Sequence, residues 1–192
     1  MNRDNLFNEL YDTLNGISEI PAGEYENFKN EFHMVEFKKG EYWIHSGEKE
    51  SRVGIIVSGL IRMYYIGNND EEYTKDFCKS KEFLSAYSSL LQDQPTELNI
   101  QMMTDSKVLV ASHKQYKKLS ETHPCWNNLN RKIAEMLFIK KETREKELLL
   151  LSAKERYLKF IDNYSDIYLQ IPQYHIASFL GISPVSLSRL KK

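Results

Sequence analysis

The chain has few of the residues that mark disulfide-rich, metal-binding or membrane-spanning proteins. Its only cysteines are Cys78 and Cys125, which form no CxxC motif. This usage is typical of a reducing cytoplasm and argues against a disulfide framework, so we expect two buried, unreactive thiols. The longest mostly apolar stretch, residues 53–61, is far shorter than the roughly 20 residues that span a bilayer. The first residues carry acids and no apolar core, so we expect neither a secretory signal nor a membrane partner.

Residue patterns that mark enzymes are also missing. The histidines are isolated, without HxH spacing: His33, His45, His113, His123 and His175. A metal site needs three or four convergent ligands. The chain also has no glycine-rich phosphate loop, which nucleotide-hydrolysing enzymes use. We therefore expect no catalytic residue, no metal and no cofactor, and we predict that the protein is not an enzyme.

The net charge of −1 hides an uneven distribution. Residues 1–100 hold ten Lys/Arg against eighteen Asp/Glu, a net of −8, and residues 101–192 hold sixteen against nine, a net of +7. No acidic residue follows Asp166. Because phosphates attract only the basic half, this asymmetry predicts two parts with different partners, of which the C-terminal one can meet nucleic acid.

Short strand-like pieces fill the chain from about residue 32 to residue 110, after a helical N-terminus of about thirty residues. Glycines and other turn residues separate the pieces at nearly regular intervals, which predicts a β-sandwich or barrel. Ser58-Gly59 lies between two apolar pieces and predicts a tight hairpin. Residues 82–91 have a more helical pattern.

A long helical stretch follows, from about residue 124 to residue 164. Apolar residues recur in it at steps of three and four, a narrow seam that suits pairing with another helix. The seam residues are Trp126, Leu129, Ile133 and Met136. We expect residues 152–164 to form the first helix of a C-terminal domain and residues 167–172 to form a short strand or turn.

The last twenty residues have the spacing of a helix-turn-helix. Ala177 leaves room for a close helix crossing, and Gly181 supplies the positive φ of the turn. Ile182 anchors the turn in the core, and Leu187 and Leu190 bury one face of the second helix.

The other face of that second helix is small, polar and basic. Its first residues suit a helix start, since Ser183 can cap it and Pro184 needs no N–H in the first turn. A helix with such a face fits a DNA major groove. The outer residues are Ser183, Pro184, Val185, Ser186, Ser188 and Arg189.

Taken together, these features resemble the Crp/Fnr family of bacterial transcription regulators. The residues that carry the resemblance are FKKGEYWIHSGE (37–48), GIIVSGLIRMYY (54–65) and IPQYHIASFLGISPVSLSRL (171–190). The resemblance implies an α+β protein with an N-terminal antiparallel β-roll, a jelly-roll-like double-stranded β-helix. A long dimerisation helix and a winged-helix-like helix-turn-helix domain follow, with a short or absent wing because the sequence ends at Lys192.

The resemblance also implies a division of labour along the chain. Residues 1–120 would form the sensor domain, residues 121–147 the dimerisation helix, and residues 148–192 the DNA-binding domain. The protein would act in the cytoplasm as a homodimer joined along the seam, on a palindromic double-stranded operator. An activator would also contact RNA polymerase. The alternative is a dimeric small-molecule sensor or interaction protein with a degenerate C-terminus that does not bind DNA.

The sensor departs from the family's cyclic-nucleotide-binding members at four positions. Those members bind the ribose hydroxyl and the cyclic phosphate with a Gly-Glu pair and, further along, an Arg followed by Ser or Thr. Ungapped alignment places these at Ser85, Ala86, Thr96 and Glu97, and none of the four residue types is kept. A phosphate without its Arg partner is costly to desolvate, and Glu97 would repel it. We therefore predict no tight binding of cyclic AMP or cyclic GMP, and the small-molecule effector is unknown.

The resemblance also assigns roles to the DNA-facing residues. Arg189 would pair with guanine, because its guanidinium reaches O6 and N7 together. Ser186 and Ser188 would bond bases or phosphates, and Val185 would contact a thymine methyl. The residues expected at backbone phosphates are His175, Lys191 and Lys192.

Overall fold

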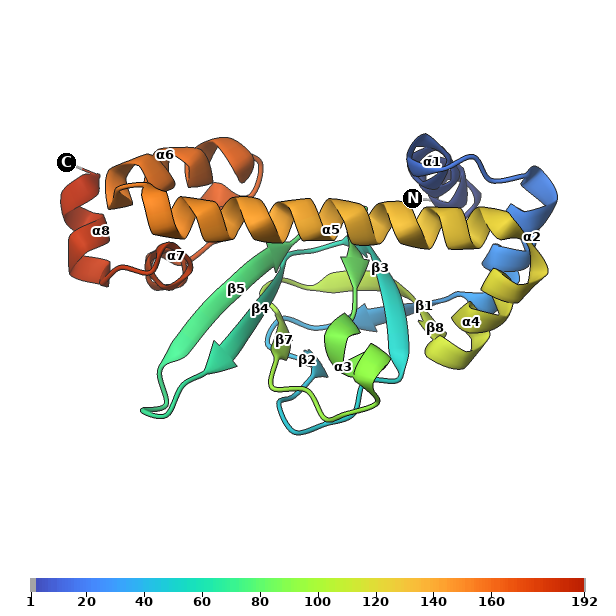
Figure 1. Ribbon diagram of the computed structural model, residues 1–192, viewed down its shortest axis with the longest axis horizontal. Helices are drawn as coiled ribbons and strands as arrows, with labels where there is room; N and C mark the ends of the chain where they lie inside the picture. The colour runs from blue at the N-terminus through green and yellow to red at the C-terminus, as the bar shows by residue number, and fades with distance from the viewer. Residues whose placement is uncertain (1–2, 192) are drawn as a thin grey trace.

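One long helix crosses a β-roll from end to end (Figure 1). The structure, a computed structural model, describes the backbone of residues 3–191 and the side chains of residues 6–191. The long helix α5 (Pro124–Leu150) has the N-terminal helices at one end and the C-terminal helices at the other (Figure 1). The predicted α+β class, with an antiparallel roll followed by a long helix and a helix-turn-helix, is confirmed.

Helices precede the roll, interrupt it once and follow it. The helices other than α5 are α1 (Arg3–Ile17), α2 (Ala22–Glu31), α3 (Tyr87–Gln92), α4 (His113–Thr122), α6 (Ala153–Asn163), α7 (Gln173–Leu180) and α8 (Pro184–Leu190). Capping boxes begin α4 and α6, where Ser112 and Ser152 accept the N–H groups of Gln115 and Glu155. Among the described residues, no helix is both long and apolar enough to cross a membrane.

The strands form two four-stranded antiparallel sheets. Their bounds are β1 (His33–Phe37), β2 (Tyr42–Ile44), β3 (Arg52–Ser58), β4 (Ile61–Ile66), β5 (Glu72–Cys78), β6 (Phe83–Leu84), β7 (Asn99–Met102) and β8 (Ser106–Ser112). One sheet has the order β1-β8-β3-β6 and the other has the order β2-β7-β4-β5. Apolar side chains from both sheets, including Ile56, Ile61, Ile100 and Val108, meet in one buried cluster between them.

The prediction of a hairpin at Ser58-Gly59 is wrong. Strand β3 pairs with β6 and β8, whereas β4 pairs with β5 and β7, so the chain crosses from one sheet to the other at this turn. Gly59 has φ +112°, and a Cβ there would lie 2.1 Å from Oγ of Ser106. The position therefore requires glycine, but the sequence does not say which strands the turn connects.

Of two further segments, one differs in part from its prediction and the other takes the second of the two forms expected for it. Of residues 82–91, only those from Tyr87 onward are helical, because Phe83 and Leu84 pair with β3 instead. Residues 167–172 contain the 3₁₀ helix η1 (Tyr168–Gln170), so they turn and form no strand.

A second apolar cluster joins the N-terminal helices, α4 and the first turns of α5 to the roll. Trp126 and Leu129 lie in it with 0% and 1% of their surfaces exposed. The prediction that these two residues face a partner helix is wrong, because their own chain buries them completely. Ile133 is half-buried against the same cluster, so only Met136 of the predicted seam, 56% exposed, is open to a partner.

Candidate DNA-binding surface and sensor contacts

The helix-turn-helix predicted at the C-terminus is formed by α7 and α8. Gly181 ends α7 with φ +66°, and the N–H of Ile182 donates to the carbonyl of Ala177 at 3.1 Å. Ser183 caps α8 by accepting the N–H of Ser186 at 3.1 Å. Leu187 is fully buried against α7 and α6. The turn thus holds α8 in one orientation by contacts close in sequence.

The opposite face of α8 is open. Pro184, Val185, Ser188 and Arg189 are exposed, with Val185 at 61%. Within the described part of the chain, the Arg189 side chain makes neither an ion pair nor a hydrogen bond. Ser186 is half-buried, and its hydroxyl lies 2.9 Å from that of Ser183. The face is therefore small, polar and basic, as the sequence predicts.

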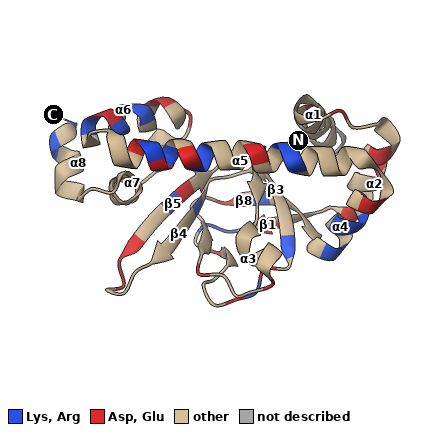
Figure 2. Ribbon diagram, in the orientation of Figure 1, with Lys and Arg blue, Asp and Glu red and all other residues tan. Residues whose placement is uncertain are grey.

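Basic residues also lie at the end of the molecule that α6 and α8 form. Figure 2 shows basic residues on α6 and α8, and α7 and α8 carry no acidic residue. Lys191 is exposed, with Nζ 5.7 Å from the ring of Tyr168. Lys192 lies outside the described residues. A polyanion approaching this end meets exposed cations at α8.

The prediction that His175 contacts DNA phosphates is wrong. Its imidazole is half-buried between α7 and the roll, where its neighbours include Arg62 and Glu72. Its Nδ1 is buried without a hydrogen-bond partner. Burial and then the charge of Arg62 lower the pKa of His175 to about 4. At neutral pH the ring is therefore uncharged, so it brings no positive charge to a phosphate.

Helix α7 closes the free edge of the sheet that ends in β5. The hydroxyl of Ser178 accepts the N–H of Thr74 at 2.8 Å and donates to the carbonyl of Glu72 at 2.6 Å. Arg144 of α5 donates to the carbonyl of Phe179 at 2.6 Å and lies over its ring. The C-terminal helices are thus tied to β5 of the roll by hydrogen bonds to its backbone, in addition to the apolar cluster around Phe77.

Asp76 joins all three parts of the chain. From β5, its carboxylate accepts the Tyr164 hydroxyl at 2.9 Å and lies 2.6 Å from Nζ of Lys140 on α5. Burial, followed by the Asp76 charge, raises the pKa of Tyr164. Burial acts to lower the pKa of Lys140, but the charges of Asp76 and Glu82 outweigh it and raise that pKa. Tyr164 is neutral and Lys140 is charged, so the partly buried Asp76 carboxylate has one hydrogen-bond donor and one cation beside it.

The sequence did not identify Ser178 or Asp76. Ser178 and Thr74 are 104 positions apart in the chain, and Tyr164 and Asp76 are 88 apart. No local pattern signals such contacts, since each residue is an unremarkable polar side chain in its own segment.

Three of the four positions predicted to have lost their cyclic-nucleotide contacts lie against one segment, residues 47–52. The Ser85 hydroxyl donates to the carbonyl of Arg52 at 3.1 Å, and the Ala86 N–H donates to the Glu50 carboxylate at 3.3 Å.

Thr96 is buried and bonds the same segment through its backbone. Its N–H donates to the carbonyl of Glu48 at 2.8 Å, and its carbonyl accepts the N–H of Gly47 at 2.7 Å. Glu97 is exposed. Ser85, Ala86 and Thr96 therefore form hydrogen bonds with residues 47–52 of the roll itself.

Both thiols are buried, as predicted. Burial is the main cause that raises the pKa of Cys78 and of Cys125, so both are protonated and unreactive at neutral pH. Among the described residues, no group of three or more His, Cys, Asp or Glu could hold a metal ion.

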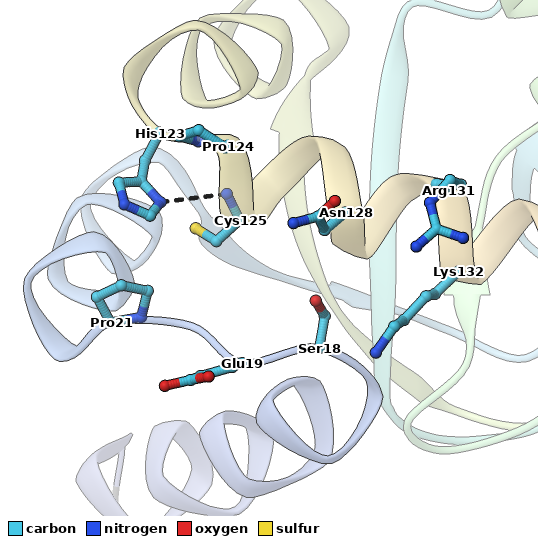
Figure 3. A pocket seen from close by; sticks show the side chains of 9 residues that line it. All are labelled: Ser18, Glu19, Pro21, His123, Pro124, Cys125, Asn128, Arg131 and Lys132. Carbon is cyan, nitrogen blue, oxygen red and sulfur yellow. Dashed lines mark hydrogen bonds between the residues drawn. The ribbon is translucent and has the colours of Figure 1, made fainter.

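A surface groove of about 460 Å³ lies at the opposite end of the molecule, between the α1–α2 turn and the start of α5 (Figure 3). His123 accepts the N–H of Cys125 there at 3.1 Å, and Lys132 donates to the carbonyl of Ile17 at 2.7 Å. The first of these bonds caps α5, and the second joins the end of α1 to α5. None of the predicted DNA-contacting or effector-pocket residues lines the groove.

Comparison with known proteins agrees with this architecture. Residues 34–123 match the family profile described as a cyclic nucleotide-binding domain. No match is found among curated proteins. Among solved structures, the c-di-GMP responsive global regulator CLP of Xanthomonas campestris is similar with a TM-score of 0.72 at 16% identity, over 88% of this chain and 89% of that chain.

Two further structures give the same result. FixK2 from Bradyrhizobium japonicum is similar with a TM-score of 0.71 at 17% identity, over 83% of this chain and 82% of that one. The catabolite activator protein of Thermus thermophilus is similar with a TM-score of 0.59 at 18% identity, over 93% and 84%. The chain therefore has the fold of the Crp/Fnr transcription regulators, with a cyclic nucleotide-binding domain profile in its β-roll, so the resemblance is confirmed in fold.

Proposed function

We propose that the protein is a sequence-specific DNA-binding transcription regulator of the Crp/Fnr type that acts in the cytoplasm as a homodimer. The observation that carries this proposal is the outer face of α8, where Val185, Ser188 and Arg189 are exposed on a helix anchored by the buried Leu187. A rigidly held helix with small, polar and basic outer residues fits a major groove.

We assign the outer residues of α8 to base contacts and the lysines that follow it to phosphate contacts. Arg189 would read guanine through two hydrogen bonds, and Val185 would contact a thymine methyl. Ser188 is the freer of the two serines, because the Ser186 hydroxyl is already engaged with Ser183. Lys191 and Lys192 would bind backbone phosphates, which position the helix without reading sequence.

Because Trp126 and Leu129 are buried in their own chain, we place the dimer contact instead on the uncovered side of α5. Lys140 points to the roll through its ion pair with Asp76, and a residue two positions away on an α-helix points to nearly the opposite side. Phe138 therefore faces away from the roll and is 64% exposed, next to Ile139 at 61%. Together with Ala134 they form an apolar surface.

A second copy of the chain is the natural cover for that surface. An uncovered apolar stripe along the middle of a 27-residue helix is unfavourable in water, and a twofold pairing of α5 with itself would bury it. Figure 1 shows this length of α5 without an element above it. Such a dimer presents two copies of α8 to one palindromic operator.

For the sensor, we propose that cyclic AMP and cyclic GMP are not the effectors. Support comes from the positions of Ser85, Ala86 and Thr96, which bond their own chain. The Xanthomonas regulator, described as responsive to c-di-GMP, has the same fold. The fold is thus compatible with effectors other than cyclic mononucleotides.

Selection of binding sites from random duplex DNA, with the purified protein at two salt concentrations, tests the proposal. We expect an enriched palindrome whose half-sites lie about one helical turn, ~34 Å, apart. The matched control is Arg189→Ala, which keeps Lys191. Weak, sequence-blind retention that salt abolishes would contradict the proposal and favour a sensor without DNA function.

A further inference from the structure

The four carbonyls that end α7, those of residues 177–180, each accept a hydrogen bond. The end of a helix leaves such groups without a partner inside the helix. Here the turn supplies two donors. The N–H of Ile182 donates to the carbonyl of Ala177 at 3.1 Å, and the N–H of Gly181 donates to that of Ser178 at 3.2 Å. The donors for the other two carbonyls come from elsewhere in the chain.

Two arginines on different helices supply those donors. Arg144 of α5 donates through Nη2 to the carbonyl of Phe179 at 2.6 Å, and its guanidinium lies 3.6 Å from the centre of that ring. Arg156 of α6 donates through Nε to the carbonyl of Leu180 at 3.2 Å. Its Nη1 donates at 2.6 Å to the carbonyl of Leu151, the residue that caps the end of α5. One guanidinium thus joins the ends of two helices.

These contacts suit a guanidinium better than any other cation in proteins. The C-terminus of a helix carries a partial negative charge, which a nearby cation stabilises. A guanidinium is planar and holds its donors in a fixed fork, so Arg156 can bond two carbonyls from different helices at once. The ammonium of a lysine is a point charge on a flexible stem and does not fix two helix ends in this way.

The end of α7 determines where α8 lies. Only residues 181–183 separate the two helices, and Leu187 of α8 is fully buried in the cluster that contains α7. Helix α5 in turn carries the proposed dimer contact. In such a dimer, the two copies of α8 are therefore related to each other through α5 and through the two arginines of each protomer.

We propose that Arg144 and Arg156 are positioning residues, which fix α8 relative to α5 and thereby set the half-site spacing that the dimer accepts. They act through the end of α7 and do not read bases. A spacing has meaning only for a dimer on DNA, so this assignment rests on the proposed function. The contacts of the two arginines do not depend on it.

Spacer length in the operator is the direct readout. One inserted base pair moves a half-site by about 3.4 Å and turns it by about 35°. Rigidly placed α8 helices require the DNA to twist back, so we expect wild type to bind such an operator about tenfold more weakly. Arg156→Met keeps an unbranched apolar stem and removes the donors. It should bind the best operator more weakly than wild type, but lose less than about threefold on the insertion.

Lys154→Met is the matched control. Lys154 is an exposed cation on the same helix, and within the described part of the chain its side chain makes neither an ion pair nor a hydrogen bond. Its variant should keep the wild-type penalty for the insertion. Weaker binding of Arg156→Met to all spacings by one common factor would overturn the proposal, because mere loss of folded protein has that effect.

Two further variants separate charge from geometry. Arg156→Lys keeps the charge but not the fork, so we expect the spacing tolerance of Arg156→Met together with stability close to wild type. If Arg156→Met does not fold, Arg156→Lys decides the test. Arg144→Met should change the spacing tolerance in the same direction. A wild-type spacing preference in Arg156→Lys would overturn the role of the guanidinium fork.

Hydrogen exchange in the full-length protein without DNA distinguishes this assignment from the proposed function. We expect the backbone N–H groups of Ile182 and Leu187 to exchange about tenfold faster in Arg156→Met and Arg156→Lys than in wild type, and at the wild-type rate in Lys154→Met. Faster exchange, without an operator selected by wild type, would reject the DNA-binding function and leave the anchoring of α7 standing. A selected operator with unchanged exchange and an unchanged spacing preference would reject the positioning role alone.

Discussion

Ser178 of α7 supplies the hydrogen-bonding partner that Thr74 lacks at the free edge of β5. Thr74 is 4% exposed, and its N–H donates to the Ser178 hydroxyl at 2.8 Å. Edge strands leave such groups unpaired unless another element covers them. The position of α7 is therefore tied to the backbone of β5.

Removal of that hydroxyl should loosen the two domains. We expect Ser178→Ala to lose about 1–3 kcal/mol of stability, because the Thr74 N–H is left buried without an acceptor. Thermal unfolding and limited proteolysis of residues 164–172 measure the effect. The control is Ser188→Ala, an exposed serine on α8, which should change neither. Equal behaviour of the two variants would show that the edge contact contributes nothing.

Arg189 should determine sequence preference at one base pair of each half-site. For Arg189→Ala we expect a loss of ~1–3 kcal/mol in operator binding and relaxed specificity at that pair. Lys191→Ala should weaken binding to all sequences alike. It should also reduce the slope of the logarithm of the binding constant against the logarithm of salt concentration by about one. Binding assays on the operator and its single-base variants, at several salt concentrations, distinguish the two effects. An unchanged base preference in Arg189→Ala would exclude it as the reading residue.

Phe138 should determine the oligomeric state. A charge in the middle of an apolar contact is costly to bury, so Phe138→Glu should raise the dimer dissociation constant by about 100-fold or more. Sedimentation over a concentration series measures it. Leu158→Glu changes a comparably exposed residue on α6, at 56%, and should leave the dimer intact.

The seam residue Trp126 should matter for folding of the protomer and not for dimerisation. Trp126→Ala should lower the free energy of unfolding by about 3–5 kcal/mol, because it opens a cavity in the protomer's own core. Phe138→Glu should leave the monomer folded. Dissociation of the dimer by Leu158→Glu, with no effect of Phe138→Glu, would place the contact elsewhere.

The sequence was informative where the determining contacts are local. Gly181, Ser183 and Leu187 act on neighbours within a few residues, so their spacing predicts both helices and the outer face of α8. The Phe32–Val110 pattern likewise predicts strands, since alternation and turn residues are local properties.

It failed where the partner is distant in sequence. Periodicity identified Trp126 and Leu129 as an apolar stripe, but the stripe is covered by the N-terminal helices of the same chain. His175 lies in the predicted helix-turn-helix beside the polar Gln173 and Tyr174, yet its ring is half-buried near Arg62 on β4. Glu50 looks like an exposed acid in a charged turn, and only the fold brings Trp43 and Ala86 to it.

His175 makes stability depend on pH in a defined range. Its pKa is about 4 in the folded protein, because burial and Arg62 disfavour the charged ring, and about 6.5 in an unfolded chain. Between these values the unfolded chain binds more protons, so stability rises with pH and is lost as the pH falls from about 6.5 towards 4. His175→Gln removes the titrating group and should flatten the thermal midpoint across this range. The exposed His33 provides the control, since His33→Gln should keep the wild-type slope; parallel curves for wild type and His175→Gln would mean that the interface does not exclude the charged ring.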